Sequence, residues 1–278
     1  MPDDADLTPL LEQYEGQTFD VKLRGRRLFK DGDWNTLCLP FSTDLTAPLF
    51  TDSREYTIME LDVTGTYYLK GDDDREKPYK TGVQDGTLYL FFKEAKSISA
   101  GTPYIVKWKE VENYNPLDPA YDYQDPVFAN VTIDKTLSSV SSNDGKLTFQ
   151  PTYAPIVWRS QDRSILFLGA GSALFFPQGN GASSIGPCRA YFKLNGIEMG
   201  NPDSGGSGGG DEFIPTGPGD VKAFVVNISD GETGITATNL TNQTNMADAW
   251  YTIDGRKLDK KPAQRGLYIS NGRKLVIK

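Results

Sequence analysis

The sequence predicts an all-β protein: an antiparallel β-sandwich with a small β-rich tail at the C-terminus. Short segments in which apolar and polar residues alternate recur along most of the chain, for example residues 19–23 and 56–63. Turn-forming sequences such as Asp85-Gly86 separate these segments. Aromatic residues make up 12% of the chain, and almost no segment has helical periodicity. Together these features favour antiparallel sheets packed face to face.

The main strands follow from this alternation and are expected at residues 19–23, 56–63, 87–92, 104–108, 127–133, 146–149, 164–168, 189–194 and 221–227. Further turns are expected at Asp31-Gly32 and at Asn143-Asp144-Gly145, because these residue types accept the backbone conformations of tight turns. Residues 7–14 are the one segment that predicts a turn or two of helix.

The glycine-rich segment at residues 202–212 has two interpretations. A flexible stretch of this kind is typical of a linker between domains. It can equally be a loop between the strands expected at 189–194 and 221–227, since closing a long loop costs little more than closing a short one. We favour the second interpretation. It predicts a β-sandwich domain at residues 1–230 with an internal loop at about 201–219, a connector at 231–247 and a β tail at 248–278.

Charge argues against binding to nucleic acids, and hydropathy argues against a membrane span. The chain has 29 Lys and Arg residues against 37 Asp and Glu residues, and its isoelectric point is near 4.8. An acidic surface repels phosphate backbones, so we expect no nucleic-acid binding. No run of 18 apolar residues is present, so we expect no membrane span.

The absence of histidine narrows the catalytic possibilities. Without it, Ser-His-Asp and Cys-His catalysis are excluded, and zinc sites lose their commonest nitrogen ligand. Cys38 and Cys188 cannot form a metal cage by themselves, so we expect no metal and no cofactor. The sequence therefore favours a non-catalytic protein. The alternative is an accessory or divergent carbohydrate-active domain that uses paired carboxylates, such as a glycoside hydrolase.

A long connection at residues 108–127 is the candidate binding surface. Tyrosine has a flat apolar face and a hydroxyl group, which suits contact with sugars or with proteins. The other interpretation is a loop whose tyrosines fold back over its own sheet. The candidate ligand contacts are three tyrosines and three polar residues, namely Tyr114, Tyr121, Tyr123, Asn113, Asp118 and Asp122.

The two cysteines are expected to be free and buried. Cys38 lies within the apolar run at residues 37–41, and Cys188 precedes the strand expected at 189–194. Free cysteine packs like a small hydrophobic residue. A disulfide is the alternative outside the cell, because an oxidising compartment permits it.

Three stretches resemble a module of secreted and cell-surface proteins of Bacteroidetes. They are KDGDWNTLCLPF at residues 30–41, AGTPYIVKW at 100–108, and the run from FLG at 167–169 to RAYF at 189–192. The resemblance implies an extracytoplasmic protein, secreted or on the outer cell surface. It also implies an adhesin-like interaction module that binds a glycan or a host or surface protein.

The last residues resemble a second feature of exported Bacteroidetes proteins. The segments at 250–258, 265–269 and 272–278 are similar to the C-terminal sorting signal of the type IX secretion route. This resemblance implies the export machinery as a partner of the tail. From the residues alone, the tail is expected to form three short strands.

Overall fold

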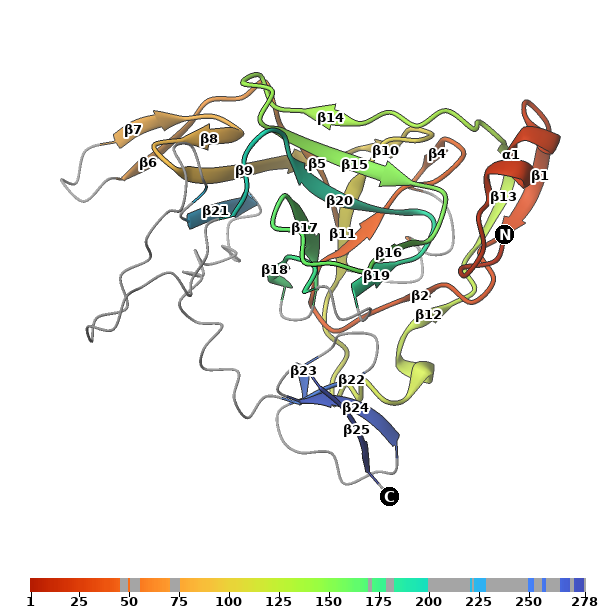
Figure 1. Ribbon diagram of the computed structural model, residues 1–278. Coiled ribbons are helices and arrows are strands. Elements are labelled where there is room, and N and C mark those ends of the chain that lie inside the picture. Colours follow the sequence, from red (N-terminus) through yellow and green to blue (C-terminus); the bar gives the residue numbers. More distant parts are fainter. Residues whose placement is uncertain are drawn as a thin grey trace.

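The computed structural model describes residues 1–45, 50, 56–70, 76–169, 172–178, 183–199, 221 and 223–228, and four strands within residues 250–277. These residues form an all-β protein, as the sequence predicted (Figure 1). The helices with described bounds are short: α1 (Thr8–Tyr14) and the 3₁₀ helix η1 (Pro119–Tyr121). No helix in this part of the chain has the length and apolar character that a membrane crossing needs.

The largest described sheet has six strands and lies in the middle of the fold. Its main path runs β21-β9-β5-β11-β3, and β8 pairs with β9. All its pairs are antiparallel except β21–β9, which is parallel. The strands are β3 (Asn35–Leu37), β5 (Tyr56–Leu61), β8 (Gly82–Gln84), β9 (Thr87–Glu94), β11 (Tyr104–Trp108) and β21 (Ala223–Ile228).

A second, five-stranded antiparallel sheet packs against one face of this middle sheet. Its order is β14-β15-β20-β17-β18. The strands are β14 (Val140–Ser141), β15 (Leu147–Thr152), β17 (Ile165–Leu168), β18 (Leu174–Phe175) and β20 (Arg189–Leu194). Phe92 of the middle sheet packs edge-on against Phe149 and Phe192 of the second sheet, with ring centroids 6.5 and 6.4 Å apart. The two sheets therefore form a sandwich around one apolar core.

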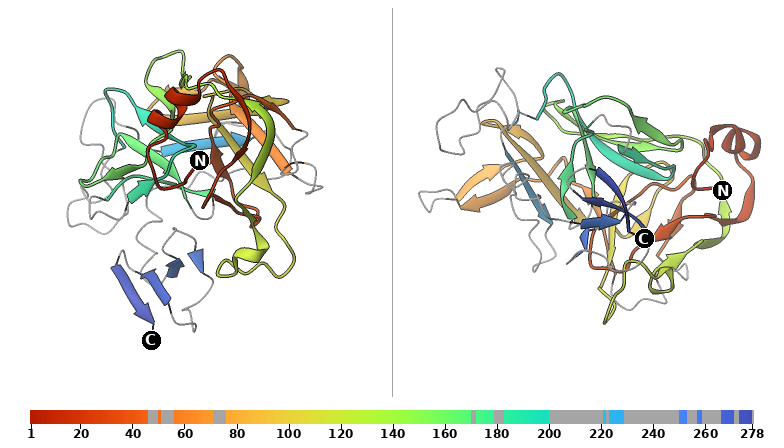
Figure 2. Two further views of the ribbon diagram at one scale, coloured as in Figure 1. Left: turned by 90° about the vertical axis from the view of Figure 1, so that its right-hand side faces the viewer. Right: turned by 60° about the horizontal axis from the view of Figure 1, so that its bottom comes forward.

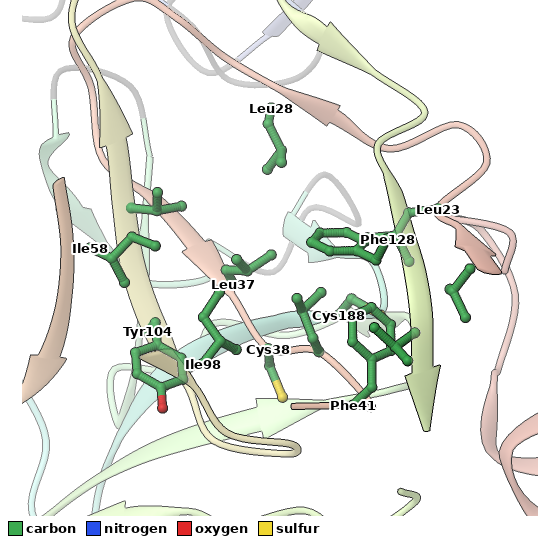
Figure 3. Close-up of a cluster of buried hydrophobic side chains, with 14 of the residues drawn as sticks. Leu23, Leu28, Leu37, Cys38, Phe41, Ile58, Ile98, Tyr104, Phe128 and Cys188 are labelled. Carbon is green, nitrogen blue, oxygen red and sulfur yellow. The ribbon is translucent and has the colours of Figure 1, made fainter. Parts of the chain in front are cut away.

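The other face of the middle sheet is also covered. A second cluster of buried side chains joins this face to α1 and to the ribbon of β1 (Thr18–Lys22) and β13 (Val127–Thr132). Figure 2 shows α1 beside this ribbon, and Figure 3 shows Phe128 of β13 among the buried side chains. Burial on both faces explains why β11 is almost continuously apolar, since neither face meets water.

The remaining described strands form short antiparallel pairs around the sandwich. They are β2 (Arg27–Leu28) with β12 (Tyr123–Gln124), β4 (Thr43–Asp44) with β10 (Ser97–Ile98), β6 (Tyr67–Lys70) with β7 (Glu76–Tyr79), and β16 (Ile156–Trp158) with β19 (Ser183–Ile185).

The expected turn at Asp85-Gly86 is present and fixes a hairpin. Gln84 of β8 pairs with Thr87 of β9, so the loop has two residues. Asp85 and Gly86 have φ of 51° and 74°. Positive φ at both central positions is the geometry that gives a two-residue hairpin the twist of its strands.

The tail has more strands than expected. Four described strands pair in the order β23-β22-β24-β25, whereas the sequence predicted three. The difference arises because residues 250–258 contribute two paired strands. The strands are β22 (Trp250–Thr252), β23 (Lys257–Leu258), β24 (Gly266–Ser270) and β25 (Arg273–Ile277).

The predicted domain boundaries fall on residues that the structure does not describe. The glycine-rich loop expected at about 201–219 and the connector expected at 231–247 both lie outside the described residues. Between them, β21 pairs with β9 over six residues, from Ala223 opposite Thr87 to Ile228 opposite Phe92. The boundaries themselves stay predictions.

Candidate functional site

The predicted tyrosine loop is organised around the carboxylate of Asp122. This side chain is fully buried and forms an ion pair with Arg27 of β2. It also accepts a hydrogen bond from the backbone N–H of Lys30 at 2.9 Å and from the hydroxyl of Tyr114 at 3.0 Å. Arg27 donates a second hydrogen bond to the carbonyl of Pro116 at 3.0 Å. These contacts hold the loop against β2.

The hydroxyl of Tyr114 is a structural donor. Burial is the largest cause that raises its pKa, and the adjacent charge of Asp122 raises it further. The phenol therefore stays protonated and keeps its hydrogen bond to Asp122. Its ring packs edge-on against Tyr121, with the centroids 6.0 Å apart.

The other predicted contacts have separate surroundings. Tyr123 packs edge-on against buried Trp108, and Nζ of Lys30 lies 4.6 Å from the centroid of its ring. Asp118 is exposed and accepts a hydrogen bond from the backbone N–H of Ala120 at the start of η1. The structure thus brings Tyr114, Tyr121 and Asp122 together, while Tyr123 belongs to a different packing contact. Asn113 is exposed and has a φ of 57°.

A second group of aromatic rings lies on the outer face of the five-stranded sheet. Its members are half-buried, and we call the group the outer aromatic face: Trp158, Phe167, Phe175 and Tyr191. The rings of Trp158 and Phe167 are nearly parallel, with centroids 6.0 Å apart. Phe167 continues to Phe175 at 6.2 Å, and Tyr191 packs edge-on against Trp158 at 5.6 Å.

Strand alternation explains how this face forms. In β20, Ala190, Phe192 and Leu194 are buried against the middle sheet. Because successive side chains point to opposite faces, Tyr191 and Lys193 point outward. Phe167 reaches the same face from β17, and it lies opposite Phe175 of β18.

Polar groups border the outer aromatic face. Gln150 lies directly across from Tyr191, and exposed Lys193 lies across from Thr148. Burial raises the pKa of Tyr191, and the charge of Asp162 raises it further, so its hydroxyl stays neutral and can donate or accept a hydrogen bond. Aromatic faces bordered by hydrogen-bonding groups suit a ligand with both apolar and hydroxylated surfaces.

The sequence interpretation missed this face. The alternation at residues 189–194 already placed Tyr191 opposite the core side of its strand. Trp158 and Phe175 gave no comparable signal, because their strands are only three and two residues long. Their meeting with Phe167 depends on strand pairing across the fold.

The described residues show no arrangement that indicates metal or acid catalysis. Among them, no group of three or more His, Cys, Asp or Glu side chains is placed to hold a metal ion. The described carboxyl groups with a shifted pKa, such as Asp62 and Asp144, are all shifted downward. A carboxyl group that acts as a general acid near neutral pH needs the opposite shift.

Both cysteines are free and buried, as predicted. The backbone N–H of Cys38 donates to the carbonyl of Cys188 at 3.1 Å, so the two residues are neighbours (Figure 3). Burial raises the pKa of the Cys38 thiol well above its ordinary value. Both thiols are therefore protonated near neutral pH.

Comparisons of the chain with protein families, with curated proteins and with solved structures gave no match.

Proposed function

We propose that this protein is a non-catalytic, adhesin-like binding module of the cell exterior and that it binds a glycan through the outer aromatic face. The observation that carries the proposal is the clustering of Trp158, from the β16–β19 pair, with Phe167, Phe175 and Tyr191 of the five-stranded sheet. A pyranose ring has an apolar face that stacks on aromatic rings and hydroxyl groups that need polar neighbours. Gln150 and Lys193 are placed to supply those neighbours.

The position of the rings supports a binding role over a purely structural one. The sandwich already has a complete apolar core on the inner side of β20. The outer rings add little to that core, and they remain half-exposed to water. Binding residues placed on a rigid strand lose less conformational freedom than residues on a loop when a ligand arrives.

The tyrosine loop is the second candidate surface for the same function. Its exposed groups are Asn113 and Asp118, and its tyrosines are half-buried. The carboxylate of Asp122 is already saturated by Arg27, Lys30 and Tyr114, so it has little capacity left for a ligand. We therefore rank this loop below the outer aromatic face.

The proposed location outside the cell is supported by the resemblance of residues 30–41 and 100–108 to surface proteins. A second resemblance, of the segments at 250–258, 265–269 and 272–278 to a C-terminal sorting signal, supports a role for the tail in export.

A glycan array, read with the full chain, tests the proposal. The wild-type protein is expected to retain one or a few glycan structures. Trp158→Ala is expected to reduce binding roughly fivefold to thirtyfold, because losing one aromatic stacking contact costs on the order of 1–2 kcal/mol.

Two control variants locate the site. Tyr68→Ala removes an aromatic side chain that is 63% exposed on β6, outside the outer aromatic face, and it is expected to bind like the wild type. Combined replacement of Tyr114, Tyr121 and Tyr123 by Ala tests the loop. If that triple variant loses binding while Trp158→Ala keeps it, the loop is the site. If no glycan binds but a protein partner does, the ligand class is wrong.

A further inference from the structure

The buried guanidinium group of Arg26 lacks acceptors for most of its donors. Arg26 is 3% exposed, and its Nη2 donates to the carbonyl of Thr36 at 2.8 Å. Within the described part of the chain, Nε and Nη1 have no hydrogen-bond partner. These two atoms carry three of the five N–H donors of a guanidinium group. Buried donors of native proteins nearly always have an acceptor, so one is missing here.

Among the described residues, Arg26 also shares its carboxylate partner with a second cation. Its ion-pair partner is Asp3, with Oδ1 3.9 Å from Nη1. Both oxygens of Asp3 are already engaged by Arg189, which donates two hydrogen bonds of 2.7 Å. The Asp3 and Arg189 side chains are 18% and 23% exposed. In the part of the chain that the structure describes, the guanidinium groups of Arg26 and Arg189 therefore share one carboxylate, so positive charge is in excess around the buried Arg26 side chain.

Neither ionisation of the Cys188 thiol nor loss of a proton from Arg26 removes this excess of positive charge near neutral pH. The thiol of Cys188 lies in the same cluster, and burial raises its pKa to about 12 even though Arg26 and Arg189 act in the other direction. It is therefore neutral near pH 7. Burial and the charge of Arg189 lower the pKa of Arg26 to about 9, which still leaves the guanidinium group charged near neutral pH.

Several separate segments of the chain meet at this cluster. Asp3 comes from the N-terminal segment, whose backbone N–H donates to the carbonyl of Arg24 at 2.9 Å. Arg189 begins β20, and the N–H of Ala190 donates to Oγ1 of Thr36 at 3.2 Å. A ligand that neutralises Arg26 would therefore stabilise the contact between the N-terminal segment, β3 and β20.

We propose that Arg26 binds a small inorganic monoanion of halide size through the N–H groups of Nε and Nη1. The excess positive charge favours an anion over a water molecule, because a buried cation is stable only when it is paired. The two nitrogen atoms are out of contact with solvent, which favours a small dehydrated ion over a phosphate or an organic acid.

Crystals of the full wild-type chain grown or soaked in sodium bromide give the direct test. The expected result is an anomalous difference peak within about 3.5 Å of Nε or Nη1 of Arg26. An ordered water without anomalous signal would overturn the proposal. So would a side chain that fills the position.

Thermal unfolding gives an independent test in solution. Chloride replaces gluconate, a much larger organic monoanion, at fixed ionic strength, so that screening by salt stays constant. The melting temperature is expected to rise with the logarithm of the chloride concentration once this exceeds the dissociation constant, by roughly 3–6 °C at about tenfold excess. A melting temperature that does not respond to chloride contradicts the proposal.

Matched variants assign the effect to Arg26. Arg26→Met keeps the apolar stem without the charge and is expected to lose the chloride response. Arg163→Met removes an arginine that already pairs with Glu198 at 3.5 Å, and it is expected to keep the response. An equal chloride response in all three proteins means that the site is elsewhere. If Arg26→Met does not fold, the bromide peak in wild-type crystals still decides the question.

Discussion

At the scale of single residues, two buried aspartates organise loops in different ways. Asp122 is neutralised by Arg27, so its loop depends on an ion pair. Asp62 is held mainly by hydrogen bonds, from the backbone N–H groups of Thr64 and Gly65 and from the hydroxyl of Tyr67. Neither carboxylate has the surroundings of a catalytic acid. Both are better understood as parts of the scaffold.

Replacing Asp122 by Ala is expected to lower the free energy of unfolding by about 3 kcal/mol, because it leaves a partly buried arginine without its partner. Chemical denaturation measures the change. Asp118→Ala is the matched control: it removes only the N-cap contact of η1 and is expected to cost about 1 kcal/mol or less. Equal losses in the two variants would show that the ion pair has no special role.

Asp62 predicts a loss of stability in acid. Burial alone raises its pKa, but the hydrogen bonds from Thr64, Tyr67 and Gly65 together outweigh burial and lower the pKa to about 2. A group with a lowered pKa stabilises the fold above its unfolded pKa of about 4, and this stabilisation is lost as the pH falls toward 2. The loss is expected to be about 2 kcal/mol between pH 4 and pH 2. Asp62→Asn is expected to show a flatter stability curve over this interval, and an unchanged slope would contradict the assignment.

At the scale of elements, β20 separates two roles on its two faces. Phe192 on the inner face stacks on Phe149 with centroids 4.4 Å apart, whereas Tyr191 on the outer face remains half-exposed. The strand therefore joins the core to the proposed binding surface. The same alternation that builds the sandwich also orients the aromatic rings outside it.

Paired variants in β20 test this division. Phe192→Ala is expected to lower the free energy of unfolding by about 3–5 kcal/mol, because it leaves a cavity between the two sheets. Tyr191→Ala is expected to cost less stability and to reduce glycan binding. Chemical denaturation and the glycan array measure the two effects. A larger stability loss for Tyr191→Ala than for Phe192→Ala would reverse the assignment of the faces.

The sequence predicts strands well where alternation or continuous burial is strong. Residues 104–108 and 189–194 form β11 and β20 with the expected bounds. Strands of two residues, such as β2 and β12, have no periodicity of their own and exist only because distant segments pair. The tyrosine loop shows the same difference between local sequence signals and contacts made by distant segments. The clustering of tyrosines at 113–123 was visible in sequence, but the contact of Asp122 with Arg27 joins residues 95 positions apart.

At the scale of the whole molecule, the middle sheet is the organising element. It has one apolar cluster on each face. The second sheet packs on one of these faces. On the other face pack α1 and the β1–β13 ribbon. The outer aromatic face lies on the exposed side of the second sheet, away from the middle sheet. Ligand binding there can proceed without opening either apolar cluster.

The tail is expected to depend on an outside surface. Thirty-one residues are too few to form a self-supporting core without a disulfide or a metal. A chain that ends after Asn245 is therefore expected to keep a folded sandwich but to bind more of a hydrophobic dye, because the surface that received the tail becomes exposed. Unchanged dye binding would mean that the tail does not pack on the sandwich.

The same truncation tests export. If residues 248–278 act as a sorting segment, the shortened chain is expected to accumulate inside the cell, as cell fractionation would detect. Normal arrival at the surface would contradict the sorting role and leave only a packing role for the tail.

The most direct test of the proposed function is a crystal structure of the full chain with a glycan selected on the array. The expected result is a sugar ring stacked on Trp158 or Phe167, with hydroxyl groups hydrogen-bonded to Gln150 or Tyr191. A glycan bound at the tyrosine loop of residues 113–123, or anywhere else with Trp158 and Phe167 uncovered, would contradict the assignment of the outer aromatic face.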